Sequence, residues 1–320
     1  MLLETSTLAI RDVACSGTCR HRSPTECAGA THLVFPYRGV FVRHVGNVDT
    51  VAESNQLVFF NDAEEYQVSH PVGGGDACLS LAIDQELLRE LSPRDQLADG
   101  AASVFRAARR GIDPRAQALV ALLRHSLSQG AIETLEAETL ALALIRRSLG
   151  ERTSHAPAAS YGRQKLVDRT KLLLATEPAR RWTLAEIARE IGVSPVYLTQ
   201  VFAQVEGIPL YRYQLRLRLA RALDLLARGD DLTTLGLQLG FSSHSHFSAA
   251  FRQLYGRTPA EFRRAVLLRQ PPKPARRPIA EDSDSGIVVP GALMAYPNDR
   301  ALGDDDDEPE DLRRMRLPPG

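Results

Sequence analysis

The chain has 320 residues, of which 44% are hydrophobic, and its 39 basic side chains are balanced by 39 acidic ones. This composition is typical of a folded globular protein and excludes a disordered or collagen-like chain. No apolar run approaches the ~20 residues of a membrane-spanning helix, and the first residues, with Glu4 and no basic cluster, do not resemble a secretory signal. We therefore expect a cytoplasmic protein of two or three domains.

The zero net charge hides an uneven distribution of charge along the chain. Residues 1–160 have 15 basic and 19 acidic side chains, whereas residues 161–270 have 17 basic and 9 acidic ones, a net charge of +8. Residues 279–320 have 4 basic and 11 acidic side chains, a net charge of −7. A basic segment in a neutral chain is the electrostatic pattern expected of a surface that binds phosphates.

The first region is predicted to be rich in strands. Between His32 and Ile83, short runs of β-branched and aromatic residues alternate with Gly, Asn, Asp and Pro clusters. Their spacing predicts a small antiparallel barrel or sandwich. Aromatic and basic side chains in this region are candidates for a small-molecule pocket, with core packing as the alternative. These candidates are Phe35, Tyr37, Arg38, Arg43, Phe59 and Tyr66.

Two helices are predicted after the strands. Leucines at helical spacing follow Pro114, and a second apolar pattern extends from Ile132 to Leu149. Helices with unpaired apolar faces need a partner surface, which is either the barrel or a second copy of the chain. We assign residues 1–110 to the predicted barrel and residues 111–150 to a helical segment that packs on the barrel or on a second copy of the chain.

Two segments lack any periodic pattern. Residues 151–162 mix Ser, Pro and Ala and are predicted to form a linker. Residues 269–320 begin with a Pro-rich basic stretch and continue into an acidic run, so we predict a disordered tail. The acidic run either keeps the protein in solution or folds back on the basic segment and competes with its ligand.

Residues 163–268 are predicted to form an all-α domain that begins with a helix-turn-helix. The segment 184–202 reads LAEIAREIGVSPVYLTQVF, in which Ala188 is small where two helices cross and Gly192 permits a left-handed turn. Ser194 is expected to cap the second helix, with Pro195 at its first position. This pairing fixes the helix N-terminus that enters a DNA groove.

The same pattern is repeated further along the chain. Gly240 lies 48 residues after Gly192, whereas Phe251 lies 49 residues after Phe202. We expect the extra residue to lie in the second recognition helix. Between the two units the sequence predicts a helix of about 18 residues, roughly 27 Å long. Such a helix would hold two recognition helices near the ~34 Å of one DNA turn.

The segment from Lys165 to Arg264 resembles the DNA-binding domain of the AraC/XylS family. The resemblance rests on LAEIAREIGVSPVYLTQVF, on RLRLARALDLL and on LGFSSHSHFSAAFRQLYGRTPAEFRR. It implies a seven-helix domain with two tandem helix-turn-helix units that binds promoter DNA and acts on RNA polymerase, most often as an activator. The strand-rich half is similar to the cupin-like effector and dimerisation domains of the same family. This similarity implies that residues 1–110 form an effector-binding domain, with the pocket candidates named above, and that residues 111–150 form a helical dimerisation segment. The implied fold class is α+β, with a cupin-like β-barrel followed by an all-α domain.

Carried over position by position, the resemblance identifies candidate DNA contacts in both recognition helices. Ala249 stands where many members have a long basic residue, and Arg is the commonest reader of guanine. We therefore expect the first unit to read sequence and the second mainly to bind the backbone, with solvated or capping residues as the alternative. On the linking helix, Arg216, Arg218 and Arg221 are either phosphate contacts or solvated and packing residues. The candidates are Ser194, Pro195, Val196, Tyr197, Thr199, Gln200, Ser243, His244, Ser245, Ser248 and Arg252.

The sequence does not favour a metal centre or a catalytic site. Cys15, Cys19 and Cys27 have a C-x3-C-x7-C spacing that matches no standard zinc motif, so inert thiols are expected, with a metal or redox site as the alternative. A catalytic cupin needs two His and a Glu closely spaced on one strand pair, and this motif is absent. The separate residues available for such a site are His32, His44, Glu53 and His70.

The sequence therefore predicts an effector-responsive, DNA-binding transcription regulator that is not an enzyme and needs no cofactor. Its expected partners are promoter DNA, RNA polymerase, a small-molecule effector and a second copy of the chain. The alternatives are a regulator that binds DNA without an effector and a metal-dependent cupin enzyme.

Overall fold

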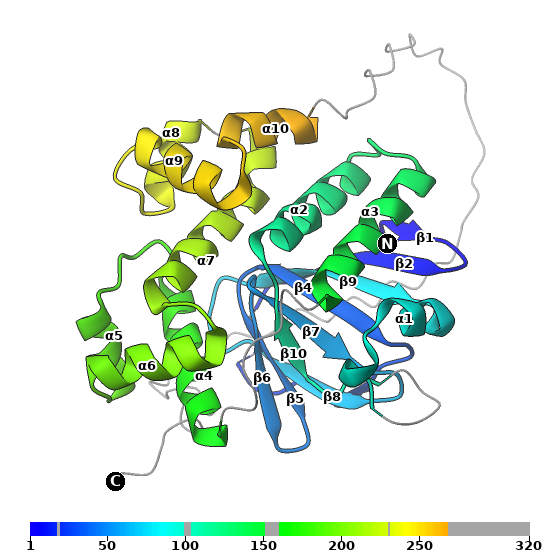
Figure 1. The fold of residues 1–320 in the computed structure, drawn as a ribbon, viewed down its shortest axis with the longest axis horizontal. Coiled ribbons are helices and arrows are strands. Elements are labelled where there is room, and N and C mark those ends of the chain that lie inside the picture. The colour runs from blue at the N-terminus through cyan, green and yellow to red at the C-terminus, as the bar shows by residue number, and fades with distance from the viewer. Residues whose placement is uncertain (18–19, 99–103, 151–159, 230, 268–320) are drawn as a thin grey trace, which may run out of the picture.

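The computed structural model describes residues 1–17, 20–98, 104–150, 160–229 and 231–267. Strands and helices separate along the chain into two parts (Figure 1), which we call the sheet region, residues 3–149, and the helical region, residues 161–267. The mixed α and β class predicted from the sequence is confirmed. Cys19, most of the predicted linker and all of the predicted tail lie outside the described residues.

The strands of the sheet region form two antiparallel sheets. One has six strands in the order β1-β2-β9-β4-β7-β10, and the other has four in the order β3-β8-β5-β6. In the part of the chain that is described, these sheets do not close into the single barrel expected from the sequence. The strands are β1 (Leu3–Glu4), β2 (Leu8–Cys15), β3 (Glu26–Cys27), β4 (His32–Arg38), β5 (Phe41–Val45), β6 (Val48–Ala52), β7 (Gln56–Phe60), β8 (Glu65–Ser69), β9 (Asp76–Ile83) and β10 (Arg109–Gly111).

Strand β2 was not predicted, although it pairs with β9 along its whole length. Only Leu8 and Ile10 of this strand are buried, and the charged residues Arg11 and Asp12 follow them. The apolar alternation that marks a strand is therefore too short to recognise in the sequence. Pairing with β9 forms the strand, and it places Cys15 directly opposite Asp76.

Three helices belong to the sheet region, namely α1 (Gln85–Leu91), α2 (Pro114–Ser128) and α3 (Thr134–Leu149). The last two match the predicted helices. Asp113 caps α2 by accepting a hydrogen bond from the Ala116 N–H at 2.9 Å. Val120 of α2 and Leu144 of α3 are buried in one core with the strands. The sheets, the first of the two partner surfaces expected from the sequence, therefore cover these apolar faces.

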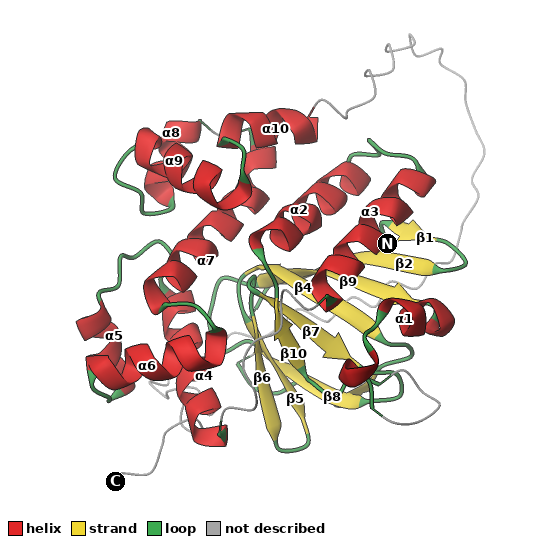
Figure 2. Ribbon diagram, viewed as in Figure 1, coloured by secondary structure: helices red, strands yellow, loops and turns green. Residues whose placement is uncertain are grey.

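The helical region consists of two groups of helices joined by one helix (Figure 2), and each group encloses a small core. Helices α4 to α6 enclose the first core, in which Ile187 and Phe202 are buried, and helices α8 to α10 enclose the second with Phe247 and Phe251. Helix α7 contributes to both. The helices are α4 (Tyr161–Thr176), α5 (Leu184–Ile191), α6 (Pro195–Glu206), α7 (Leu210–Leu225), α8 (Leu232–Gln238), α9 (His244–Tyr255) and α10 (Pro259–Leu267).

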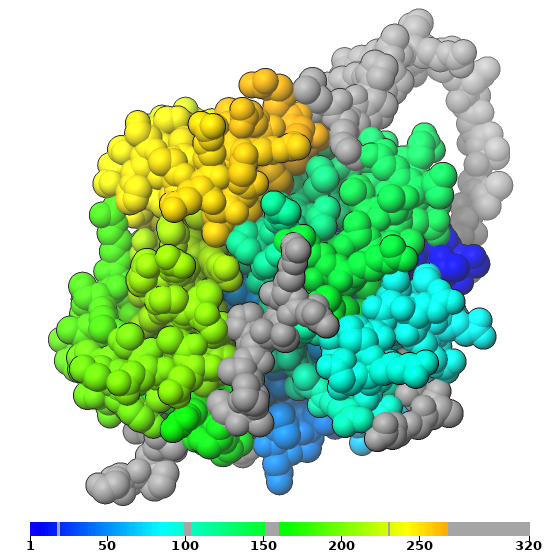
Figure 3. Space-filling view, viewed as in Figure 1, coloured from blue at the N-terminus to red at the C-terminus, as the bar shows by residue number. Residues whose placement is uncertain are grey.

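The helical region packs along one side of the sheet region (Figure 3). Ala121 of α2 belongs to the same apolar cluster as Leu219 of α7 and Phe251 of α9. Leu172 of α4 is buried with Val42 of β5. Helix α2 is therefore buried on two faces, by the sheets on one and by the second half of the helical region on the other.

Candidate DNA-binding surface

The first helix-turn-helix is fixed by local hydrogen bonds. Thr183 and Glu186 form a capping box at the start of α5. Gly192 ends this helix with a φ of 79°, and its N–H donates to the Ala188 carbonyl at 3.0 Å. Ser194 then accepts a hydrogen bond from the Tyr197 N–H at 3.2 Å, so that α6 begins where the sequence predicted.

Helix α6 presents its predicted contact residues to solvent. Leu198, Val201 and Phe202 are buried and anchor the helix, whereas the side chain of Val196 is 69% exposed. Thr199 is partly engaged, because its hydroxyl donates to the Pro195 carbonyl at 2.9 Å. All six candidates from the first unit are exposed, namely Ser194, Pro195, Val196, Tyr197, Thr199 and Gln200.

The second helix-turn-helix repeats this construction, with one difference that corrects the sequence interpretation. Ser243 caps α9 by accepting from the His246 N–H at 3.1 Å, as Ser194 caps α6. Both recognition helices have 12 residues, so the extra residue does not lie in the second helix. It is Ser242 in the turn before α9, because Phe241 is followed by two residues before the helix begins and Val193 by only one.

The polar side chains of α9 are tied more closely to their own helix than those of α6. His244 Nε2 lies 3.3 Å from the Ser248 hydroxyl, and both residues are partly buried. His246 Nδ1 lies 3.0 Å from the Ser242 hydroxyl. The remaining predicted contacts, Ser243, Ser245 and Arg252, are exposed, as is Ala249.

Helix α7 connects the two units, and two of the three arginines considered there as phosphate contacts, Arg218 and Arg221, have partners within the chain. Its 16 residues correspond to roughly 24 Å, close to the length predicted from the sequence. Arg218 donates hydrogen bonds to the carbonyls of Pro178 and Arg180, and Arg221 pairs with Asp224. These contacts support the packing alternative for Arg218 and Arg221.

A groove of about 310 Å³ lies between the two units, and sequence reasoning did not identify it. Its two arginines give it a basic lining. In the sequence, the groove could have been suggested only by the pair Arg181 and Trp182, which stands immediately before the capping residue of α5. This pair lies far in sequence from the residues of the second unit that complete the groove. The lining residues are Arg181, Trp182, Tyr211, Gln214, Leu215, Arg218, Gly240, Phe241 and His246.

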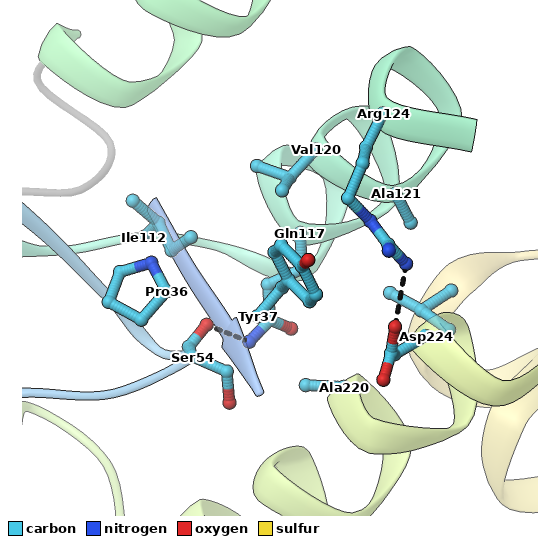
Figure 4. A pocket seen from close by; sticks show the side chains of 11 residues that line it. Pro36, Tyr37, Ser54, Ile112, Gln117, Val120, Ala121, Arg124, Ala220 and Asp224 are labelled. Atoms are coloured by element: carbon cyan, nitrogen blue, oxygen red, sulfur yellow. Dashed lines mark hydrogen bonds and ion pairs between the residues drawn. The ribbon is translucent and has the colours of Figure 1, made fainter. Parts of the chain in front are cut away.

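The contact between the sheet and helical regions contains a buried ion pair. Arg124 of α2 pairs with Asp224 of α7 at 2.7 Å, and its guanidinium lies 3.9 Å from the centre of the Tyr37 ring (Figure 4). A cavity of only about 10 Å³ lies between these side chains. Such a space is about one water molecule in size. Tyr37 is thus the only one of the six predicted effector residues that lines this cavity.

A second group of charges lies at the other end of this contact. Lys171 of α4 is 2.7 Å from Glu206 and 3.9 Å from Glu53, which accepts a hydrogen bond from the Tyr213 hydroxyl. Gln56 donates to Glu206 at 3.1 Å. Burial raises the pKa of Glu53, and the charge of Lys171 opposes that rise. Like the first, this group joins residues at least 100 positions apart.

The other predicted effector residues do not gather around the same cavity. Phe35 and Phe59 are buried in the main core of the sheet region, where Phe59 stacks on Phe105. Arg43 is fully buried and pairs with Glu64. For these residues, packing within the sheets is the observed role. Arg38 is partly buried at the end of β4, and the Tyr66 hydroxyl donates to Glu26 at 3.0 Å.

The residues considered for a cupin metal site are dispersed. His32 contacts Ser80, and His44 lies between Asp49 and Ser69. Within the described ranges, no cluster of potential metal ligands contains two of the four residues considered. Of the cysteines considered as ligands, Cys27 is exposed and Cys15 is partly exposed.

Comparison with known proteins matches the helical region. Residues 187–265 match the family described as Helix-turn-helix domain. The chain is 38% identical over 93 residues to the HTH-type transcriptional regulator ArgR of Pseudomonas aeruginosa, and 32% identical over 84 residues to the regulatory protein PocR of Salmonella typhimurium. These matches cover 29% and 26% of this chain, and the chain spans 28% of the length of each relative.

A solved structure from Chromobacterium violaceum, described as a transcriptional regulator of the AraC-type DNA-binding domain-containing proteins, is 33% identical to this chain. The match covers 35% of this chain and 98% of that one, with a TM-score of 0.32.

Among the described helices, none has both the length and the apolar content needed to cross a membrane.

Proposed function

The chain belongs to the AraC-type helix-turn-helix family, and we propose that it is a sequence-specific DNA-binding transcription regulator whose recognition helices α6 and α9 enter successive major grooves. The observation that carries this proposal is the pair of 12-residue helices, each capped by a serine and joined by α7. A helix of this kind contacts base edges with its N-terminal residues. The basic groove between the units supports binding of the intervening phosphates.

In this proposal the two units have different tasks. Helix α6 reads bases with Gln200 and its neighbours, which are exposed. Helix α9 mainly contacts the DNA backbone, because Ala249 is too short to reach a base and His244 is hydrogen-bonded to Ser248 of its own helix. Residues 163–268 are the DNA-binding domain.

The sheet region is proposed to bind the effector and to control the helical region. Its two sheets are consistent with a cupin-like domain in residues 1–110. Within residues 111–150, dimerisation is proposed through the exposed side of α3, where Leu135 is 75% exposed. The contact made by Arg124 and Asp224 joins the sheet region to the linking helix of the DNA-binding units. An effector that changes this contact changes how the two units are presented to a promoter and to RNA polymerase.

The salt dependence of DNA binding tests the proposal. Operator sequences are first selected from a random DNA pool with the full-length protein, and affinity is then measured from 50 to 200 mM salt. Counterion release predicts a steep decline, about 10³-fold or more for six or more phosphate contacts. Affinity that does not change with salt would contradict DNA binding by this surface.

Effector dependence needs a separate measurement. A thermal-shift screen of the full-length protein against metabolites should identify a ligand, because a ligand stabilises the state that binds it. The same ligand should change operator affinity. If ligands that raise the melting temperature leave operator affinity unchanged, the protein binds DNA without effector control, and the DNA-binding proposal stands on its own.

A further inference from the structure

Three side chains with metal-binding chemistry meet at one end of the sheets. Cys15 ends β2, His70 directly follows β8, and Asp76 begins β9. The register of β2 and β9 places Cys15 opposite Asp76. The Cys15 sulfur, a ring nitrogen of His70 and a carboxylate oxygen of Asp76 all lie within 4.8 Å of one another.

Two of these three side chains are buried without a complete set of partners. His70 is 8% exposed and Asp76 is 5% exposed. His70 Nε2 lies 2.9 Å from Asp76 Oδ2, close enough for an ion pair, yet neither this oxygen nor His70 Nδ1 has a hydrogen-bond partner among the described residues. Buried polar atoms are almost always paired, so these two atoms point to a missing ligand.

The backbone around the trio is built for close approach. Gly17 and Gly75 both have left-handed φ angles, and a Cβ on Gly75 would lie 2.6 Å from the Cys15 carbonyl oxygen. A Cβ on Gly39 would lie 2.2 Å from the Gly75 carbonyl oxygen. Without side chains at these positions, the segments that carry Cys15 and Asp76 pack directly against each other.

We infer that Cys15, His70 and Asp76 bind a divalent transition-metal ion of the zinc class. A thiolate, an imidazole and a carboxylate are the three donor types that zinc accepts in proteins, and three protein ligands leave a fourth position for water or a small molecule. On binding, the Cys15 thiol loses its proton to solvent and its sulfur bonds to the metal, with no change of oxidation state. This set of ligands differs from the cysteine cluster considered in the sequence, since it includes neither Cys19 nor Cys27.

The site lies next to the contact with the helical region. The short loop between His70 and Asp76 contains Val72, which packs in the same cluster as Leu172 of α4. A metal that holds both ends of this loop fixes the position of Val72. Metal binding therefore stabilises the surface on which the first DNA-binding unit rests.

Titration of the metal-free full-length protein with Co²⁺ tests the site. Cobalt bound to a thiolate produces a charge-transfer band in the near ultraviolet, and we expect this band to saturate at one Co²⁺ per chain and to disappear when Zn²⁺ is added. Cys15→Ser should abolish the band, whereas Cys27→Ser should leave it unchanged. Zn²⁺ affinity measured by dialysis should fall for His70→Ala and Asp76→Asn by more than the ~100-fold typical of residues that only support a ligand.

A measurement on the unaltered protein covers the case in which these variants do not fold. Zn²⁺ should slow the alkylation of Cys15, read by mass spectrometry, and leave the alkylation rate of Cys27 unchanged. The inference is overturned if the folded protein shows no thiolate band with Co²⁺, or if the band persists in Cys15→Ser. Equal alkylation of Cys15 with and without Zn²⁺ would also overturn it.

Discussion

Side chains at the start of α6 combine exposure with a rigid support. Leu198 and Phe202 are buried beneath the helix, and the cap at Ser194 fixes its first turn. Gln200 lies on the exposed side of this anchored turn and has an amide group that can pair with an adenine edge. The backbone that carries Gln200 is thus fixed before DNA is bound, and this lowers the entropy cost of recognition.

Replacing Gln200 by alanine should reduce specificity more than general affinity. We expect Gln200→Ala to cost about 1–3 kcal/mol on the selected operator and much less on random DNA. Gln204→Ala is the matched control, because Gln204 is also exposed on α6 but lies one turn farther from the N-terminus, where it accepts from Arg163 at 3.2 Å. Fluorescence anisotropy with both DNAs measures the difference. An equal loss on both would show that Gln200 does not read bases.

Residues of the helix-turn-helix could be predicted because their roles depend on neighbours in sequence. The cap of Ser194 on Tyr197 and the turn at Gly192 join positions only a few residues apart. The role of Arg43 could not be predicted in this way. Its partner Glu64 is 21 positions away, on a segment brought near only by the packing of the sheets. From the sequence alone, Phe59 fits a ligand pocket and a core equally well, because the sequence does not show which residues pack against it.

At the level of elements, the turn glycines of the two units have different surroundings. Gly192 and Gly240 have φ angles of 79° and 80°. A Cβ on Gly192 would meet nothing within 4 Å, whereas a Cβ on Gly240 would lie 2.1 Å from the Ala179 carbonyl oxygen. Arg181 also donates to the Gly240 carbonyl at 2.7 Å. The turn of the second unit is therefore a contact point with the loop before α5 of the first.

The two glycines give a matched pair of variants. Gly192→Ala should cost about 1–2 kcal/mol of folding free energy from the left-handed backbone alone. Gly240→Ala should cost more, because the loop at Ala179 must also move. Urea unfolding measures the folding free energy of both variants. For Gly240→Ala, the affinity for an operator with a fixed half-site spacing should fall by more than the loss of folding free energy explains. Equal losses of folding free energy in the two variants would show that the loop at Ala179 moves without a measurable cost.

Helices α2 and α3 were predicted within a few residues, but the surface that covers α2 was not. Its apolar pattern shows that the faces are buried, and the sequence left the barrel and a second copy as alternatives. The structure adds the second half of the helical region, through Ala121 and Phe251. Nothing local in the sequence connects α2 with α9, because the contact spans well over 100 positions. Strand β2 was missed because its apolar alternation is short and its partner β9 lies 61 to 75 positions away.

In the whole molecule, the contact between the two regions holds both DNA-binding units on one support. Arg109 pairs with Asp168 at 2.6 Å beside the first unit, and Arg124 pairs with Asp224 at 2.7 Å beside α7. His125 lies next to Arg124, with its Nε2 3.1 Å from the Leu223 carbonyl oxygen. Burial, reinforced by the charge of Arg124, lowers the pKa of His125 to about 4.

This shift makes stability sensitive to acid. His125 is neutral in the packed state, so protons favour the unfolded state, and the loss develops as pH falls from about 6.5 towards 4. At pH 5 the contribution is at most about 2 kcal/mol relative to pH 7. His125→Gln should remove this part of the pH dependence in urea unfolding. His246→Gln, at an exposed position, should keep it. A pH dependence unchanged in His125→Gln would contradict the prediction.

The charged contact between the regions also has a consequence for the chain when it opens. Asp168, Asp224 and Lys171 on the helical region, and Arg109 and Arg124 on the sheet region, all regain their hydration when the regions separate. The surfaces exposed to water at these points are polar rather than apolar. Only these charged parts of the contact stay well solvated on opening, because separation of the regions also exposes the apolar cluster of Ala121, Leu219 and Phe251.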